Sequence, residues 1–108
     1  MALTVSDSGT KTATGSGTED DLSTKTAAGV YVLGIDTATL INDVSLTLRI
    51  YTKVLSGGTE RLVYEAVYKH AQGEPTKYSP PVPVAFSIRC TIAQSNTGTA
   101  FPWSLMTL

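Results

Sequence analysis

Hydrophobic and polar residues alternate with a period of two along most of the chain after residue 29. In the stretch VSLTLRIYTKV, the aliphatic or threonine positions run from Val44 to Val54 in steps of two, and polar or aromatic residues lie between them. This spacing is typical of a β-strand with one covered face, because a helix would scatter the same apolar positions around its axis. The same alternation predicts strands over residues 30–36, 60–70, 84–93 and 101–106. In the strand 84–93, Phe86 and Cys90 are predicted to face inward with the aliphatic residues.

The strands 44–54 and 60–70 are predicted to form a hairpin. Its loop is the five-residue segment Leu55–Thr59, in which Gly57 and Gly58 allow the chain to reverse. A one-residue slip would turn the whole apolar set outward, so the hydrophobic pattern selects one register. The predicted cross-strand pairs are Thr52–Leu62, Ile50–Tyr64 and Leu48–Ala66 on the inner face, and Arg49–Glu65 and Tyr51–Val63 on the outer face.

Residues 1–28 differ from the rest of the chain because Ser, Thr, Gly and Ala dominate them. Threonine-rich alternation permits short strands there, and the interspersed glycines would weaken them. Two interpretations stay open: a pair of short edge strands, which we favour, or an arm that orders only on a partner. Residues 29–108 are predicted to form the antiparallel β domain.

Proline limits two further segments. Residues 71–83 contain four prolines and are predicted to be an extended connection rather than a central strand, because proline lacks a backbone donor. Pro102 places the last strand at a sheet edge or at a bulge. About six to eight short strands without an amphipathic helix predict an all-β fold, a small antiparallel β-sandwich or barrel.

Composition narrows the function. The chain has 108 residues, the size of one domain, and a formal net charge of −1, which argues against nucleic acid as a partner. Charged residues make up 16% of the chain, below the usual ~25%. Two interpretations fit this composition: the outer face contacts other protein, or the chain is an ordinary soluble domain. Neither a signal peptide nor an apolar run of membrane-spanning length is visible, so we expect a soluble protein made in a reducing cytoplasm, without a membrane partner.

Chemistry-bearing residues are few. His70 is the sole histidine and is predicted to be a polar residue at a strand end rather than a general base. Cys90 is the sole cysteine and is predicted to be a buried, inert thiol. The acidic cluster Glu19, Asp20 and Asp21 is predicted to form a solvated turn rather than a cation site. We therefore expect no catalytic residue, no metal, no cofactor and no enzymatic activity.

Aromatic and proline residues are the candidates for a binding surface. Tyr51 is predicted to lie on the outer face of the hairpin, where an aromatic ring can stack on a sugar or anchor a protein interface. Ordinary cross-strand packing and rigid linkage explain the same residues without a partner. The candidate interface residues are Tyr51, Tyr78, Pro80, Pro81 and Trp103.

Three stretches carry a family resemblance: AGVYVLGIDTATL, then RIYTKVLSGGTERLVYEAVYKHAQGEPTKYSPPVP, and the closing FPWSLMTL. From about Gly17 to the end, the chain resembles small virion structural proteins of tailed bacteriophages, in length and in these strings. The resemblance implies a capsid decoration (cement) protein that binds outside the lattice of the major capsid protein and stabilises the head. It also implies a homo-oligomer, a trimer or a dimer, at the capsid surface of the virion. The alternatives are a tail, neck or fibre component of the virion, or a carbohydrate-binding β-sandwich module.

Overall fold

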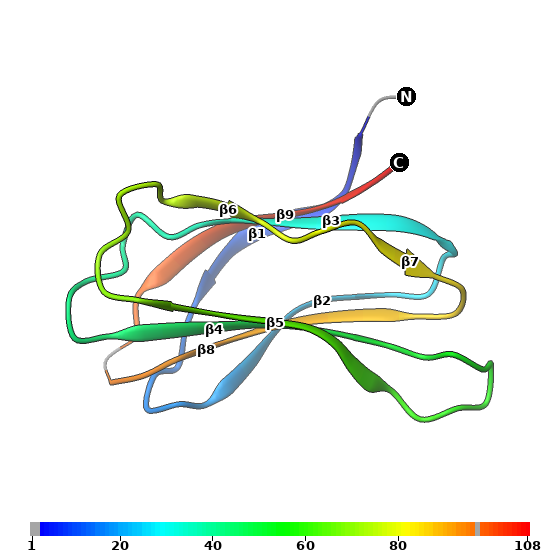
Figure 1. The fold of residues 1–108 in the computed structure, drawn as a ribbon, viewed down its shortest axis with the longest axis horizontal. Helices are drawn as coiled ribbons and strands as arrows, with labels where there is room; N and C mark the ends of the chain where they lie inside the picture. The colour runs from blue at the N-terminus through cyan, green and yellow to red at the C-terminus, as the bar shows by residue number, and fades with distance from the viewer. Residues whose placement is uncertain (1–2, 97) are drawn as a thin grey trace.

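The computed structural model describes residues 3–96 and 98–108, and these residues form a β-sandwich of two antiparallel sheets (Figure 1). The predicted all-β class is confirmed, as a sandwich that measures 40 × 31 × 19 Å. The described part of the chain has nine strands, more than the predicted six to eight, because the proline-rich segment contributes two strands of three residues each. Within residues 3–96 and 98–108 there is no helix that could cross a membrane.

The two sheets have five and four strands. In the five-stranded sheet the order is β1 (Thr4–Thr12), β9 (Ala100–Thr107), β3 (Gly29–Asp36), and then β6 (Thr76–Tyr78) and β7 (Val82–Val84), which pair with different parts of β3. In the four-stranded sheet the order is β2 (Glu19–Lys25), β8 (Ile88–Gln94), β4 (Ser45–Thr52) and β5 (Arg61–Lys69). Segments 4–12 and 19–25 are therefore edge strands, one on each sheet.

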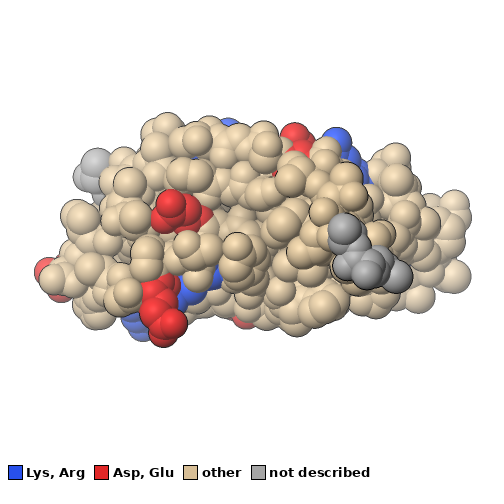
Figure 2. Space-filling view, turned by 90° about the horizontal axis from the view of Figure 1, so that it is seen from above, with Lys and Arg blue, Asp and Glu red and all other residues tan. Residues whose placement is uncertain are grey.

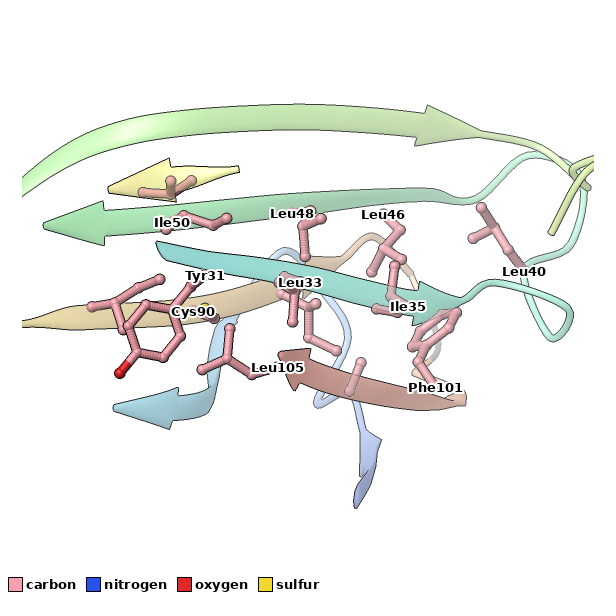
Figure 3. Packing of buried hydrophobic residues seen from close by; sticks show 14 of the residues in the cluster. Tyr31, Leu33, Ile35, Leu40, Leu46, Leu48, Ile50, Cys90, Phe101 and Leu105 are labelled. Carbon is pink, nitrogen blue, oxygen red and sulfur yellow. The ribbon is translucent and has the colours of Figure 1, made fainter. Parts of the chain in front are cut away.

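The core lies between the sheets and is built by the inward positions of the four inner strands (Figure 3). Their alternation in the sequence is the reason that they form strands with one buried face. The fully buried side chains of these strands include Tyr31, Leu33, Ile35, Leu46, Leu48, Ile50, Ile88, Cys90, Ile92, Phe101 and Leu105. The predicted burial of Cys90 is confirmed.

The β4–β5 hairpin follows the predicted register only in its first half. Arg49 pairs with Glu65 and Ile50 with Tyr64, but a bulge then shifts the register by one residue, so Tyr51 pairs with Leu62. The predicted pairs Thr52–Leu62 and Tyr51–Val63 are therefore wrong. A bulge opposes two residues to one, and the residue beyond it turns to the other face. The outward position of Leu62, which is 48% exposed, follows from this shift.

The hairpin loop is longer than predicted. β4 ends at Thr52 and β5 begins at Arg61, so the loop covers residues 53–60 instead of Leu55–Thr59. Val54 was expected on the inner face but is 82% exposed, because the strand ends before it. The chain reverses where the Gly58 N–H donates to the Leu55 carbonyl at 2.9 Å.

Prolines divide the segment between β5 and β8. The predicted single strand 84–93 is wrong, because β7 belongs to the five-stranded sheet and β8 to the other sheet. Residues 85–87 cross between the sheets, and Phe86, expected to point inward, is exposed in this crossing. The predicted extended connection 71–83 holds β6 and the first two residues of β7. Between these strands, the Ser79 N–H donates to the Leu33 carbonyl and the Ser79 hydroxyl accepts the Leu33 N–H.

Pro102 lies in β9, which has neighbours on both sides, and its pairing with Thr10 is regular, so both predicted alternatives, an edge strand and a bulge, are wrong. The Ala13 N–H donates to the Thr99 carbonyl, which sets the phase of the β1–β9 ladder. By alternation from that bond, the backbone nitrogen of Pro102 points away from β1 and toward β3. The pairing of β9 with β3 starts at Trp103, one residue after Pro102 in the chain. The ladder with β3 is therefore absent at the position where proline has no donor to contribute.

Candidate interaction surface

The outer faces of the two sheets differ sharply in charge. The four-stranded sheet carries a network of acidic and basic side chains that bond to one another. Arg49 on β4 contacts Glu65 at 2.8 Å and Glu19 at 3.5 Å. Strand order produces this convergence, because β8 places β2 and β4 on its two sides. The charges of this face are thus largely satisfied within the molecule.

Tyr51 is part of this network. Its hydroxyl donates to Glu19 at 2.7 Å, and the guanidinium of Arg89 lies 4.4 Å from the centre of its ring. Because Glu19 accepts this hydrogen bond, the pKa of Tyr51 is raised. One face of the ring and the hydroxyl group are therefore occupied by neighbours, which assigns Tyr51 a packing role in this sheet.

Arg89 joins the outermost strand to the hairpin loop. It bonds Asp21 on β2 and Glu60 beside β5, each at 2.8 Å. These hydrogen bonds raise the pKa of Arg89, and the bond to Glu60 has a larger effect than the bond to Asp21. The acidic cluster at 19–21, predicted to be a solvated turn, is instead part of strand β2. Glu19 and Asp21 belong to this network, and Asp20 bonds Thr14.

Three carboxyl groups have lowered pKa values. The hydroxyl of Ser23 is the largest cause for Asp7, and the backbone N–H of Thr14 is the largest cause for Asp20. For Glu19, partial burial by itself would raise the pKa, but hydrogen bonds from Thr91 and Tyr51 and the charge of Arg49 outweigh it. Each of these contacts stabilises the charged carboxylate in the folded chain. The bond from Ser23 to Asp7, at 2.7 Å, also links the edge strands of the two sheets.

The outer face of the five-stranded sheet carries little charge. By the alternation of its paired strands, the outward positions hold mainly Ser, Thr, Val, Pro and Met, and Asp36 is the single charged residue among those described. Figure 2 views the molecule from this side and shows a surface on which uncharged residues predominate. A flat, largely uncharged surface of this kind suits contact with protein, because the centres of protein interfaces are depleted in charge.

A shallow hollow of about 370 Å³ lies on this face between β9, β3 and β6. Gly34 forms its floor, and the ring of Tyr78 lies over that glycine. A Cβ atom at position 34 would lie 2.8 Å from Cε1 of Tyr78, so only glycine lets the ring lie this close to the sheet. Met106 and Pro102 line the opposite side. The hollow can receive one apolar or small polar side chain of a partner.

The five predicted interface residues therefore do not form a single surface. Tyr78 is 62% exposed beside the hollow, and Pro80 and Pro81 are exposed in the segment that follows it. Trp103 borders the hollow through its place in β9, but by alternation with Phe101 and Leu105 its side chain points to the inner face, where it packs against the core. The structure places Tyr78 at the hollow on the outer face, Trp103 on the inner side of the same sheet and Tyr51 on the other sheet.

Sequence reasoning missed Gly34 and Met106. An isolated glycine inside a strand often marks a place where another group approaches the backbone closely, and that signal was present at Gly34 in VYVLGID. Met106 carried no comparable signal, since its position depends on the pairing of β9 with β3.

The remaining chemistry-bearing residues have structural surroundings. His70 follows β5 with a φ of 66°, and its Nδ1 accepts the Asp43 N–H at 3.0 Å, so it closes a loop as predicted for a strand-end residue. Burial raises the pKa of Cys90 to about 12, which keeps its thiol protonated at neutral pH. In the described part of the chain, no three His, Cys, Asp or Glu residues are grouped to hold a metal ion.

Comparison with known proteins gives few matches. No protein-family model matches the chain, and no curated protein matches it either. Two matching solved structures are those of the Gt and Gx strains of infectious bursal disease virus, with TM-scores of 0.49 and 0.46 and identities of 17% and 15%. Each match covers 96% of this chain, which spans only 31% and 30% of the matched chains. Neither is named as a tailed bacteriophage, so the resemblance to phage proteins stays a prediction.

Proposed function

We propose that this chain is a non-enzymatic structural protein of a virion, a capsid decoration protein that binds the outside of the major capsid protein lattice. The observation that carries the proposal is the largely uncharged outer face of the five-stranded sheet, opposite a face whose charges are largely paired within the molecule. The resemblance of the sequence to small virion proteins of tailed bacteriophages supports the capsid as the partner in this proposal.

In this proposal the five-stranded sheet lies against the capsid and the hollow receives a capsid side chain. Tyr78 and Met106 supply apolar contact at the hollow, and hydroxyl groups such as that of Thr10 surround it on β1. Each copy contributes a modest contact area, and many copies around the lattice junctions together resist the internal pressure of the packaged DNA. No covalent step is required.

Sedimentation with expanded heads that lack this chain tests the proposal. The purified chain should bind saturably and co-sediment with the heads. Thr10→Lys places a charge on the outer face of the five-stranded sheet, and Thr24→Lys places the same charge on the outer face of the four-stranded sheet. Both threonines are exposed residues of edge strands, so they form a matched pair. Thr10→Lys should weaken binding strongly and Thr24→Lys should not.

Two results would count against this function. Absence of saturable binding by the wild-type chain would exclude capsid decoration. Equal binding by both threonine variants and the wild type would exclude the five-stranded sheet as the binding face. A copy number of only a few chains per virion would favour a tail, neck or fibre position instead, because a decoration protein occupies many equivalent positions on the capsid.

A second candidate is a carbohydrate-binding module, favoured by the exposed ring of Tyr78 beside the hollow with Asp36 near it. An exposed aromatic ring next to a carboxylate can stack on a sugar and accept hydrogen bonds from its hydroxyls. A glycan array decides between the two: a specific signal that Tyr78→Ala removes would support sugar binding, and silence of the array would remove this candidate.

A further inference from the structure

Among the residues that the structure describes, no strand lies beside the outer edge of β5, so this edge presents unpaired backbone groups. β5 is the last strand of the four-stranded sheet, and its partner on the inner side is β4. Beyond the bulge at Val63 the ladder is regular from Tyr64 to Lys69. An edge of this kind is a template for another strand unless something blocks it. β5 contains no proline, so each of its residues has a backbone donor. In its regular part, the side chains on the outer face are those of Glu65, Val67 and Lys69.

The hydrogen-bond phase of the hairpin shows which groups point outward. The His70 N–H donates to the Val44 carbonyl at 3.0 Å, so the pair Val44–His70 is hydrogen-bonded. Bonded and non-bonded pairs alternate in an antiparallel ladder. Tyr64, Ala66 and Tyr68 therefore bond to β4, and the backbone groups of Glu65, Val67 and Lys69 point to the free edge.

The position of Gln72 agrees with this phase. Its side-chain amide donates to the Lys69 carbonyl at 2.8 Å, on the side away from β4. A carbonyl oxygen has two lone pairs, so a second donor can share this acceptor or displace the exposed amide.

We propose that two copies of this chain pair through β5, antiparallel and about a two-fold axis at Val67. In this register Val67 faces Val67 of the second copy, and Glu65 of each copy faces Lys69 of the other. Each residue whose backbone groups point to the free edge then lies opposite such a residue of the second copy. The free N–H and C=O groups of both edges can therefore bond to each other. The two four-stranded sheets become one continuous sheet of eight strands.

Charge selects this register over its neighbours. A shift that centres the pair on Glu65 would oppose Glu65 to Glu65 and Arg61 to Lys69, and a shift that centres it on Lys69 would oppose Lys69 to Lys69. Like charges in directly opposite positions destabilise a strand pair. A pair centred on Val63 would fall on the bulge and lose the regular ladder.

The other sheet edges are less suited to pairing. β2 has a bulge between Asp21 and Ser23, and the prolines among residues 75–83 remove donors along β6 and β7. β1 has a bulge near its start, and its regular part presents the uncharged residues Ser8, Thr10 and Thr12 outward, so no charge pattern selects a register there. A closed two-fold pair also uses up both edges, which prevents growth into a fibre.

A charge-exchange experiment tests the register by sedimentation velocity on the purified chain. The wild type should form a dimer as its concentration rises. Lys69→Glu and Glu65→Lys should each dimerise about ten- to a hundredfold more weakly alone, because each creates two like-charge pairs in the dimer. An equimolar mixture of the two variants should form a heterodimer, because each variant then meets the opposite charge. A monomeric wild type, variants that dimerise like the wild type, or a mixture no stronger than its components would overturn the proposal.

Val67→Pro tests the edge without altering charge. The Val67 N–H points away from β4, so proline there removes no hydrogen bond of the hairpin. This variant should keep the wild-type circular dichroism spectrum and remain monomeric, while Val67→Thr, which keeps the donor, should still dimerise. In wild type, the amides of Glu65, Val67 and Lys69 should gain protection from hydrogen exchange with concentration. Dimerisation of Val67→Pro, or absence of that gain, would contradict pairing through β5. The purified chain alone is used, so failure here leaves capsid binding by the other sheet untouched.

Discussion

Replacing Arg89 by alanine should destabilise the fold without affecting the binding face. Arg89 lies on the outer face of the four-stranded sheet, and its side chain is 27% exposed. It contacts Asp21, Glu60 and the ring of Tyr51, which belong to three different segments of the chain. Loss of its guanidinium therefore frees edge strand β2 and the end of the hairpin loop at once.

The magnitude follows from the three contacts taken separately. Asp21 is 65% exposed, and an exposed ion pair of this kind contributes only ~0–0.5 kcal/mol. The pair with Glu60, in which both side chains are 27% exposed, contributes about 1 kcal/mol after solvent screening. The cation–π contact with Tyr51 adds ~0.5–1 kcal/mol. Arg89→Ala should thus lower the free energy of unfolding by about 2 kcal/mol. Arg89→Lys, which keeps the charge but lacks the planar fork, should cost about half of that.

Urea unfolding followed by tryptophan fluorescence measures these losses. Arg61→Ala is the control, because Arg61 is exposed on β5 and makes no ion pair with the residues that the structure describes, so its loss should stay within about 0.5 kcal/mol. At a temperature where it is folded, Arg89→Ala should still bind heads. An unchanged unfolding midpoint for Arg89→Ala would refute the structural role of the network. If Arg89→Ala had wild-type stability but no longer bound heads, the binding surface would lie on the four-stranded sheet and not on the five-stranded sheet.

Three further results are expected. Gly98→Ala should cost about 1–3 kcal/mol in urea unfolding, because a Cβ there would collide with the Ala13 carbonyl oxygen; wild-type stability would show that the contact relaxes freely. The three carboxyl groups with lowered pKa values, which include Glu19, stabilise the fold fully at a pH above their pKa in the unfolded chain. This stabilisation should be lost as the pH falls through their lower pKa values in the folded chain, and a free energy of unfolding independent of pH below about 4 would contradict it. Cys90 should react with a thiol reagent in urea but resist it in the native chain, since burial raises its pKa to about 12; rapid native labelling would contradict that burial.

Local alternation was enough to predict the core strands β3 and β4 and the inward residues of β8, but not the division of residues 84–93 between the two sheets. The inward residues of β3, β4 and β8 repeat at every second position, and burial of one face requires that pattern. The first half of the hairpin register was predictable for the same reason. The bulge at Val63 was not, because nothing in the local sequence distinguishes a regular pair from a bulge.

The binding surface was harder to predict than the fold because it depends on strand order. Alternation placed Tyr51 correctly on an outer face, but its availability depends on Glu19 and Arg89, which arrive from β2 and β8. Likewise, Tyr78 reaches the hollow only because β6 pairs with β3 opposite Gly34. Contacts between strands distant in sequence carry no periodic signal, so the choice between the two aromatic residues required the three-dimensional structure.

The cost of dehydration determines which sheet can serve as the binding face. Burial of the four-stranded sheet against a partner would strip water from the four ion pairs on its surface, and mutual attraction rarely repays that loss in full. Burial of the other sheet dehydrates mostly hydroxyl and apolar groups, at a much smaller cost. On the proposed function, the five-stranded sheet therefore lies against the capsid and the charged sheet faces solvent. Because β5 belongs to the solvent-facing sheet, pairing through its edge would join neighbouring copies without competing for the bound face. If both proposals hold, adhesion to the lattice and connection between copies use separate surfaces of the same small sandwich.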